Sequence, residues 1–163
     1  DRRSPNPKHM RLLDYLRPDL VLTDLSADDM PSTVQLLAHR LAETGAVGSE
    51  EEARAGLQAR EEAHTTVMGH GLAIPHTMLP GLSDPVLLLA VAPEPVPFGP
   101  PGTEPVQVFF TILSPPNRQG EHIKLLARIC RLTRHDDFVD DLVASSTTDE
   151  ALAVIRRVDE EHV

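Results

Sequence analysis

Two strongly apolar runs in the second half of the chain limit its possible folds more than any other feature. Residues 86–91 form the first run, and residues 106–113 form the second, with Phe109 and Phe110 near its centre. The first run is continuous, which is typical of a β-strand that is covered on both faces, and the second is the strongest strand candidate of the chain. Segments with helical spacing lie before and after these runs, without a strict strand–helix–strand order. We therefore predict an α/β fold in which a central mixed β-sheet is flanked by α-helices.

Capping residues and turn formers predict where the other elements lie. We expect a short helical turn within residues 12–16 and further strands at residues 20–25, 65–68 and 72–74. Six prolines between residues 92 and 105 predict an irregular loop there. The predicted helices begin at Asp28 or Asp29, Ser49, Gly120, Asp136 and Thr147.

The helix predicted from residue 120 is amphipathic. His122 falls in its first turn, where free backbone N–H groups favour an anion. Ser114 lies beside a Pro-Pro pair and is expected in a turn, without a catalytic role. The apolar face is predicted to consist of Ile123, Leu126, Ala127 and Cys130, widened by Leu125, Ile129 and Leu132.

Length and composition narrow the class of protein. At 163 residues and 40% hydrophobic content, one globular domain is expected. The formal net charge of −10 argues against nucleic acid as a partner, because nucleic-acid binding needs basic patches. Neither a membrane span of about 18 apolar residues nor a signal peptide is visible, so no direct membrane insertion is expected. The single cysteine, Cys130, suits a reducing cytoplasm.

The chain begins with a segment of different character. Residues 1–9 are charged and contain prolines. Such a composition cannot bury apolar surface and is typical of a flexible segment. We therefore expect a flexible arm or linker at residues 1–9, followed by a single domain at residues 10–163.

The stretch at residues 60–76 has the features of a functional site. Two glycines lead into a short apolar run, which Pro75 ends directly before His76. A histidine presented on a rigid strand end can act as a nucleophile or a base. The alternative for His76 is a structural role, and Arg60 and His122 would then be ordinary surface residues.

Three segments of the chain carry a family pattern. Residues 69–76 have the sequence G-H-G-L-A-I-P-H, and Arg60-Glu61 precedes them, with Arg60 sixteen residues before His76. Residues 120–129 have the sequence G-E-H-I-K-L-L-A-R-I. In this order and spacing the segments resemble the A domain (EIIA) of the phosphoenolpyruvate-dependent sugar phosphotransferase system, in its fructose/mannitol and nitrogen-regulatory branch. The resemblance covers about residues 12–160.

The resemblance implies a fold, a chemistry and a set of partners. The family's fold is a central mixed sheet with helices on both sides. His76 would carry a phosphoryl group, His122 would assist it, and Arg60 would stabilise its charge. The chain would be a phosphocarrier that accepts the group from a histidine phosphocarrier protein. It would pass the group to a B-type sugar-transporter component, or use it as a signal towards a regulatory target protein in nitrogen regulation.

This chemistry needs no cofactor and no metal, because a neutral imidazole is a competent nucleophile towards phosphorus. The enzymatic character of the chain depends on whether the phosphohistidine forms. The alternative function is a non-catalytic regulatory module of the same fold, which docks to a transporter, a channel or a kinase.

Further expectations concern the surroundings of His76. A metal site with His64 and His70 would need a bent chain, because six residues of strand span roughly 20 Å, and no zinc motif supports it. His64, His70 and Val67 also depart from the family pattern, which suits a divergent regulatory member. The acidic tail at residues 159–161 is expected to lie far from the site. The docking rim around the site is predicted to consist of Leu72, Met78 and Leu79.

Overall fold

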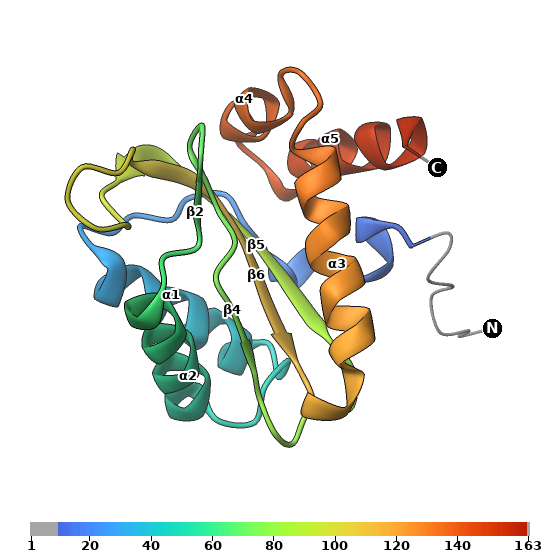
Figure 1. The fold of residues 1–163 in the computed structure, drawn as a ribbon. Coiled ribbons are helices and arrows are strands. Elements are labelled where there is room, and N and C mark those ends of the chain that lie inside the picture. The colour runs from blue at the N-terminus through green and yellow to red at the C-terminus, as the bar shows by residue number, and fades with distance from the viewer. Residues whose placement is uncertain (1–9, 163) are drawn as a thin grey trace.

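The computed structural model describes residues 10–162, which form a six-stranded mixed sheet with helices on both faces (Figure 1). The strand order is β1-β5-β6-β3-β2, and β4 also pairs with β6. The strands are β1 (Val21–Leu22), β2 (Val67–Gly69), β3 (Leu72–Ala73), β4 (His76–Met78), β5 (Val86–Val96) and β6 (Val106–Ser114). The helices are α1 (Met30–Glu43), α2 (Glu50–Ala63), α3 (Gln119–Leu132), α4 (Phe138–Val143) and α5 (Thr148–Glu161). The short 3₁₀ turns are η2 (Leu12–Asp14), η3 (Pro18–Leu20) and η4 (Pro116–Arg118).

The predicted fold class is confirmed, whereas the predicted arm at residues 1–9 lies outside the described residues.

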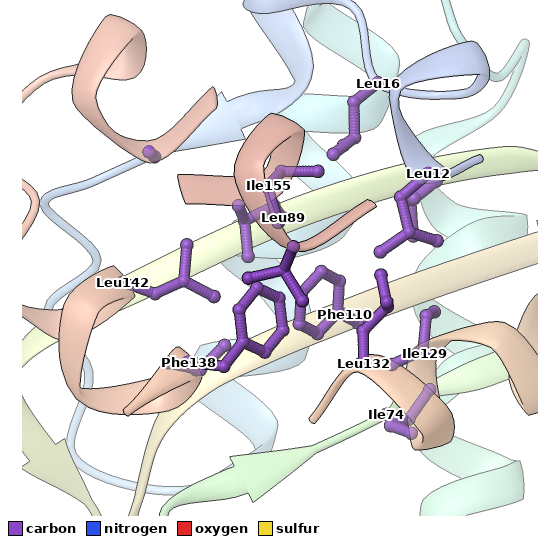
Figure 2. Close-up of a cluster of buried hydrophobic side chains, with 14 of the residues drawn as sticks. Leu12, Leu16, Ile74, Leu89, Phe110, Ile129, Leu132, Phe138, Leu142 and Ile155 are labelled. Carbon is purple, nitrogen blue, oxygen red and sulfur yellow. The ribbon is translucent and has the colours of Figure 1, made fainter. Parts of the chain in front are cut away.

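The two apolar runs form the central pair of the sheet. β5 and β6 are antiparallel, with Leu89 opposite Phe110, whereas β1 is parallel to β5 and both β3 and β4 are parallel to β6. Neighbouring aromatic residues of β6 face opposite sides. Phe110 stacks on Phe138 at a centroid distance of 6.2 Å, and Phe109 meets Phe98 edge-on at 5.1 Å. One apolar core therefore lies under α3, α4 and α5 (Figure 2), and a second lies under α1 and α2.

Side-chain caps begin three of the helices as predicted. Asp29, Ser49 and Thr147 cap α1, α2 and α5, and each accepts the backbone N–H three residues further on at 2.9–3.1 Å. α4 begins one residue later than predicted, after Asp137, which has a left-handed φ of 68° and makes no side-chain cap bond. None of the helices within residues 10–162 has the length and apolar character that crossing a membrane requires.

The irregular loop predicted at residues 92–105 begins later than expected, because β5 continues to Val96. This extension contains Pro93 and Pro95, which can donate no hydrogen bond to a neighbouring strand. They are tolerated because β1 pairs only with the earlier part of β5, and because the pairing with β6 shifts its register at this point. The Gln107 amide fills the gap by donating to two carbonyl oxygens of the extension at 3.1 and 3.2 Å.

His76 was predicted at the end of a strand that stops at Pro75, but the strand pairing continues beyond His76. β3 and β4 pair with β6 in one continuous register, which places His76 opposite Ile112. They are two pieces of one strand, interrupted at Pro75 because proline has no N–H to donate. The Pro75 carbonyl still accepts the Ile112 N–H at 2.9 Å and holds the break against the sheet. His76 therefore lies at a break inside a strand, with sheet pairing on both sides.

Only one side of the apolar face predicted for α3 lies against the sheet. Leu125, Ile129 and Leu132, which were predicted to widen that face, are fully buried, and His122 beside them is 4% exposed, whereas Ile123 is 64% exposed. The two sides have similar helical spacing, so the position of the sheet decides which of them is covered. This orientation turns His122 inwards, and it does not lie on the solvent-facing side that the alternative interpretation required.

The acidic tail at residues 159–161 begins with a buried carboxylate. Asp159 of α5 is 0% exposed, and its carboxylate accepts the backbone N–H groups of Leu12 and Leu13, each at 3.1 Å. Arg128 of α3 donates to the same carboxylate at 3.0 Å. A buried carboxylate needs such partners, because burying an unpaired charge is costly. Asp159 thus holds η2 against α3 and α5.

Candidate functional site

His76 begins β4, and its side chain is half-buried. Its Nδ1 lies 2.7 Å from the carbonyl oxygen of Ile74, in the break between β3 and β4. A carbonyl oxygen can only accept a hydrogen bond, so Nδ1 carries a proton and donates it. In the neutral ring the free lone pair is therefore on Nε2, and this is the atom that can act as a nucleophile.

The surroundings of His76 favour its neutral form. Burial is the largest cause that lowers the pKa of His76 below its ordinary value of 6.5. The positive charge of Arg60 lowers this pKa further, while the hydrogen bond to Ile74 and the carboxylate of Glu61 oppose the change. The imidazole is consequently neutral at pH 7 and has a lone pair to offer.

His122 reaches the same place from α3. The chain leaves β6 at Ser114, turns through η4, and returns along the first turn of α3. The rings of His76 and His122 lie with their centroids 5.5 Å apart and their planes tilted by 56°. Only 4% of His122 is exposed, and burial together with the neighbouring His76 lowers its pKa to about 4. Both rings are therefore neutral at pH 7, which avoids repulsion between two imidazolium charges.

Arg60 lies in the last turn of α2 and is partly exposed. One terminal nitrogen of its guanidinium donates to the carbonyl oxygen of His64 at 2.7 Å. Its positive charge lowers the pKa of His76. The other N–H groups of Arg60 make no hydrogen bond within residues 10–162. They are available to an anion, which a guanidinium can bind with two parallel hydrogen bonds.

Glu61 is a structural member of the site to which sequence reasoning gave no role. It is 7% exposed, and its carboxylate accepts the Thr66 N–H at 2.5 Å, the Thr66 hydroxyl at 2.6 Å and the Thr65 hydroxyl at 3.2 Å. These bonds fix the segment that connects α2 to β2, directly after Arg60. The signal in the sequence that could have indicated this role is an acidic residue followed at short distance by two threonines.

The histidines spaced along the stretch are not grouped around a metal position. His64 is exposed after the end of α2, and His70 is exposed in the turn between β2 and β3, with a positive φ of 55°. The His70 backbone N–H binds the Glu104 carboxylate at 3.0 Å and ties this turn to the proline-rich loop. Within residues 10–162, no three His, Cys, Asp or Glu side chains are placed so that they could hold a metal ion.

The docking rim predicted around His76 is wrong for two of its three residues. Leu72 and Leu79 are only 3% and 6% exposed, because they pack into the cores on either side of the sheet. Met78 is partly exposed. Ile123, which follows His122 on the outer face of α3, is 64% exposed.

Ser114 is the second residue that sequence reasoning missed. It is not in a turn but is the last residue of β6, paired with Met78, and it is fully buried. Its Oγ lies 2.6 Å from Nδ1 of His122. The two prolines that follow Ser114 suggested a turn, and only the position of α3 reveals the contact.

The site thus combines three groups that suit an anionic reactant. They are a neutral nucleophilic nitrogen on His76, a second imidazole on His122, and the guanidinium of Arg60. Backbone N–H groups in the first turn of α3 add a favourable field for negative charge. Such an arrangement can receive an anionic group on Nε2 of His76 and stabilise the charge that develops around it.

Comparison with known proteins gives one consistent result. The family model described as "Phosphoenolpyruvate-dependent sugar phosphotransferase system, EIIA 2" matches residues 14–158. A nitrogen regulatory protein of Bradyrhizobium diazoefficiens is 34% identical over 147 residues, which span 90% of this chain and 95% of that protein. The fructose-specific EIIA component of Haloferax volcanii is 26% identical over 138 residues, covering 82% and 90% of the two chains.

Solved structures share the fold. The nitrogen regulatory protein IIA-Ntr from Neisseria meningitidis superposes with a TM-score of 0.80 at 24% identity, covering 88% of this chain and 98% of that one. The mannitol enzyme IIA of Escherichia coli, solved in complex with phosphorylated mannitol enzyme IIB, gives a TM-score of 0.73 at 17% identity, covering 87% and 97%. At these identities the superpositions establish the fold alone.

Proposed function

The chain belongs to the EIIA 2 family of the phosphoenolpyruvate-dependent sugar phosphotransferase system, and from this membership we propose that it is a phosphocarrier whose acceptor atom is Nε2 of His76. The observation that carries the proposal is the hydrogen bond from Nδ1 of His76 to the Ile74 carbonyl. This bond leaves the lone pair on Nε2, in a ring whose centroid lies 5.5 Å from that of His122.

The transfer step exchanges one N–P bond for another. The lone pair of Nε2 attacks the phosphorus of a donor phosphohistidine, and the donor N–P bond breaks as the new bond to His76 forms. The electron pair of the broken bond returns to the donor ring, whose other nitrogen carries a proton, so that the donor leaves as a neutral imidazole. The proton on Nδ1 of His76 remains in its hydrogen bond to Ile74, and the positive charge of the donor ring is thereby passed to the phosphorylated ring of His76. No metal is needed, because transfer depends mainly on positioning and on stabilising the charge of the transferred group.

Arg60 and His122 supply that stabilisation in the proposed mechanism. Arg60 offers the N–H groups that make no hydrogen bond within residues 10–162, and a guanidinium matches the geometry of phosphoryl oxygens. His122 acts as a neutral partner, because its pKa of about 4 keeps it uncharged at pH 7. A neutral donor steadies the phosphoryl group without trapping it, which a carrier requires.

The proposed donor is a histidine phosphocarrier protein, and the proposed acceptor is a B-type transporter component. The mannitol enzyme IIA, which has this fold, is known in complex with phosphorylated enzyme IIB, which supports the second partner. The similarity to nitrogen regulatory proteins supports a further use, in which the phosphorylation state of His76 is read by a regulatory target protein.

The experiment is phosphorylation from phosphoenolpyruvate through the general carrier proteins of the system. One acid-labile phosphoryl group per chain is expected on His76, and His76→Gln should abolish it. His64→Gln and His70→Gln are matched controls, because both side chains are exposed and are not grouped with the rings of His76 and His122. They should be labelled like the wild type.

Two results would count against the proposal. Peptide mapping that places the label on another histidine would move the acceptor site. A chain that takes no label from active carrier proteins would instead favour the non-catalytic regulatory module, which docks to a transporter, a channel or a kinase.

A further inference from the structure

The buried contact between Ser114 and His122 constrains a proton position that the proposed transfer uses. Ser114 is 0% exposed and is held by strand pairing, and its carbonyl oxygen accepts the Leu79 N–H at 2.8 Å. Its hydroxyl oxygen lies 2.6 Å from Nδ1 of His122. The backbone that carries this hydroxyl is therefore fixed in the sheet, while the imidazole belongs to a helix packed on it.

The direction of this hydrogen bond follows from counting donors. Within residues 10–162, the Ser114 hydroxyl has no hydrogen-bond partner other than Nδ1 of His122. If Nδ1 carried the proton and donated it, the Ser114 O–H would be a buried donor without an acceptor, which is unfavourable. If the hydroxyl donates, Nδ1 accepts with its lone pair and no buried donor is left unpaired. The second arrangement is therefore the favoured one.

We infer that Ser114 is a positioning residue, whose hydroxyl donates to Nδ1 of His122 and fixes that ring as the tautomer with its proton on Nε2. The part of this inference that concerns transfer rests on the proposed function. The tautomer gives His122 an N–H donor on the ring atom that Ser114 does not occupy. The opposite tautomer would present a lone pair there, which repels phosphoryl oxygens.

The two neighbouring imidazoles are consequently fixed as complementary tautomers, one by a hydrogen-bond acceptor and the other by a hydrogen-bond donor. The Ile74 carbonyl accepts from Nδ1 of His76 and leaves a lone pair on Nε2. The Ser114 hydroxyl donates to Nδ1 of His122 and leaves an N–H on Nε2. One ring can thus attack phosphorus while the other donates to the group that is transferred.

The first test reads the tautomer directly and needs no phosphoryl transfer. Two-bond ¹H–¹⁵N correlation spectra of the ¹⁵N-labelled chain at about pH 7 distinguish a protonated from an unprotonated ring nitrogen. His122 is expected to show protonated Nε2 and unprotonated Nδ1. A wild-type spectrum with protonated Nδ1 would overturn the inference, whatever the transfer assays give.

The second test compares three serine variants. Ser114→Ala removes the donor and should give His122 a mixture of tautomers, whereas Ser114→Thr keeps a hydroxyl and should retain the wild-type tautomer. Ser145→Ala is the matched control, because Ser145 is also a buried serine but donates to the Asp141 carbonyl at 3.0 Å, away from the two rings. Circular dichroism establishes that each variant is folded.

Single-turnover transfer then measures the consequence for function. Ser114→Ala should slow onward transfer about tenfold, by analogy with the lower end of what hydrogen-bond partners of metal-ligating histidines contribute, and Ser114→Thr should restore most of the rate. A Ser114→Ala protein with a wild-type tautomer or a wild-type rate would overturn the positioning role. If the wild type takes no phosphoryl group at all, the proposed function fails, and the tautomer spectra still decide whether Ser114 fixes His122.

Discussion

The imidazole rings of His76 and His122 lie next to each other, with their centroids 5.5 Å apart and their planes tilted by 56°, although one belongs to the sheet and the other to α3. Each ring lies in a setting that lowers its pKa, so that neither is charged at pH 7. The pair therefore adds no fixed positive charge, and in the proposed mechanism Arg60 supplies the positive charge. This division leads to separate predictions for the guanidinium and the imidazoles.

Arg60→Lys should slow phosphoryl transfer roughly tenfold while leaving the fold intact, because lysine keeps the charge but loses the planar, forked donor geometry. Single-turnover transfer measures the effect. Arg54→Lys in the same helix is the matched control, since Arg54 is paired with Glu51 at 2.6 Å. Equal rates in the two variants would remove Arg60 from the site.

His122→Ala should still accept a phosphoryl group on His76 but should pass it on more slowly. The barrier should rise by less than about 3 kcal/mol, because a site open to partners stays partly solvated. Rapid-quench measurement of both half-reactions separates acceptance from onward donation. His39→Ala, on the exposed side of α1, controls for the loss of a histidine. Loss of labelling in His122→Ala would indicate that His122 is needed for acceptance as well.

Acidification should destabilise the protein partly through His122. Its pKa of about 4 in the folded chain lies below the ordinary 6.5. Between these values the unfolded chain binds a proton that the folded chain does not, so stability present above pH 6.5 is lost as the pH falls towards 4. The loss amounts to at most about 3–4 kcal/mol.

Denaturant unfolding of wild type and His122→Gln at pH 7 and at about pH 4.5 checks this expectation. The variant should lose less of its free energy of unfolding on acidification. A loss of the same size in both proteins would show that the acid sensitivity comes from other groups.

Asp159→Lys should destabilise the fold by about 3–5 kcal/mol, because it leaves Arg128 buried without its partner and removes the acceptor of two backbone N–H groups. Glu160→Lys, at the next and exposed position, should change the free energy of unfolding by no more than about 0.5 kcal/mol. Thermal or denaturant unfolding distinguishes the two. Similar values would mean that the buried carboxylate does not hold η2 in solution.

The sequence was sufficient for those elements that depend on local chemistry. The two apolar runs, and the caps Asp29, Ser49 and Thr147, predict elements that the structure contains. The assigned roles of the site residues remain predictions, although the structure brings His76 and His122 together.

What the sequence could not predict depends on contacts between elements that are distant in the chain. α3 has two apolar faces, and the sheet decides that Ile123 faces solvent. Pro75 marks a stop locally, yet β6 offers pairing on both sides of it. The Ser114 hydroxyl meets His122 only after η4 has reversed the chain.

The break at Pro75 has a consequence for how a carrier can serve two partners in succession. His76 is flanked by sheet pairing on both sides, and its ring is held by Ile74 within the same break. An acceptor held in this way has little conformational entropy left to lose when a partner arrives. Under the proposed function, donor and recipient would therefore meet the same rigid target, and any adjustment of shape on docking would fall to them.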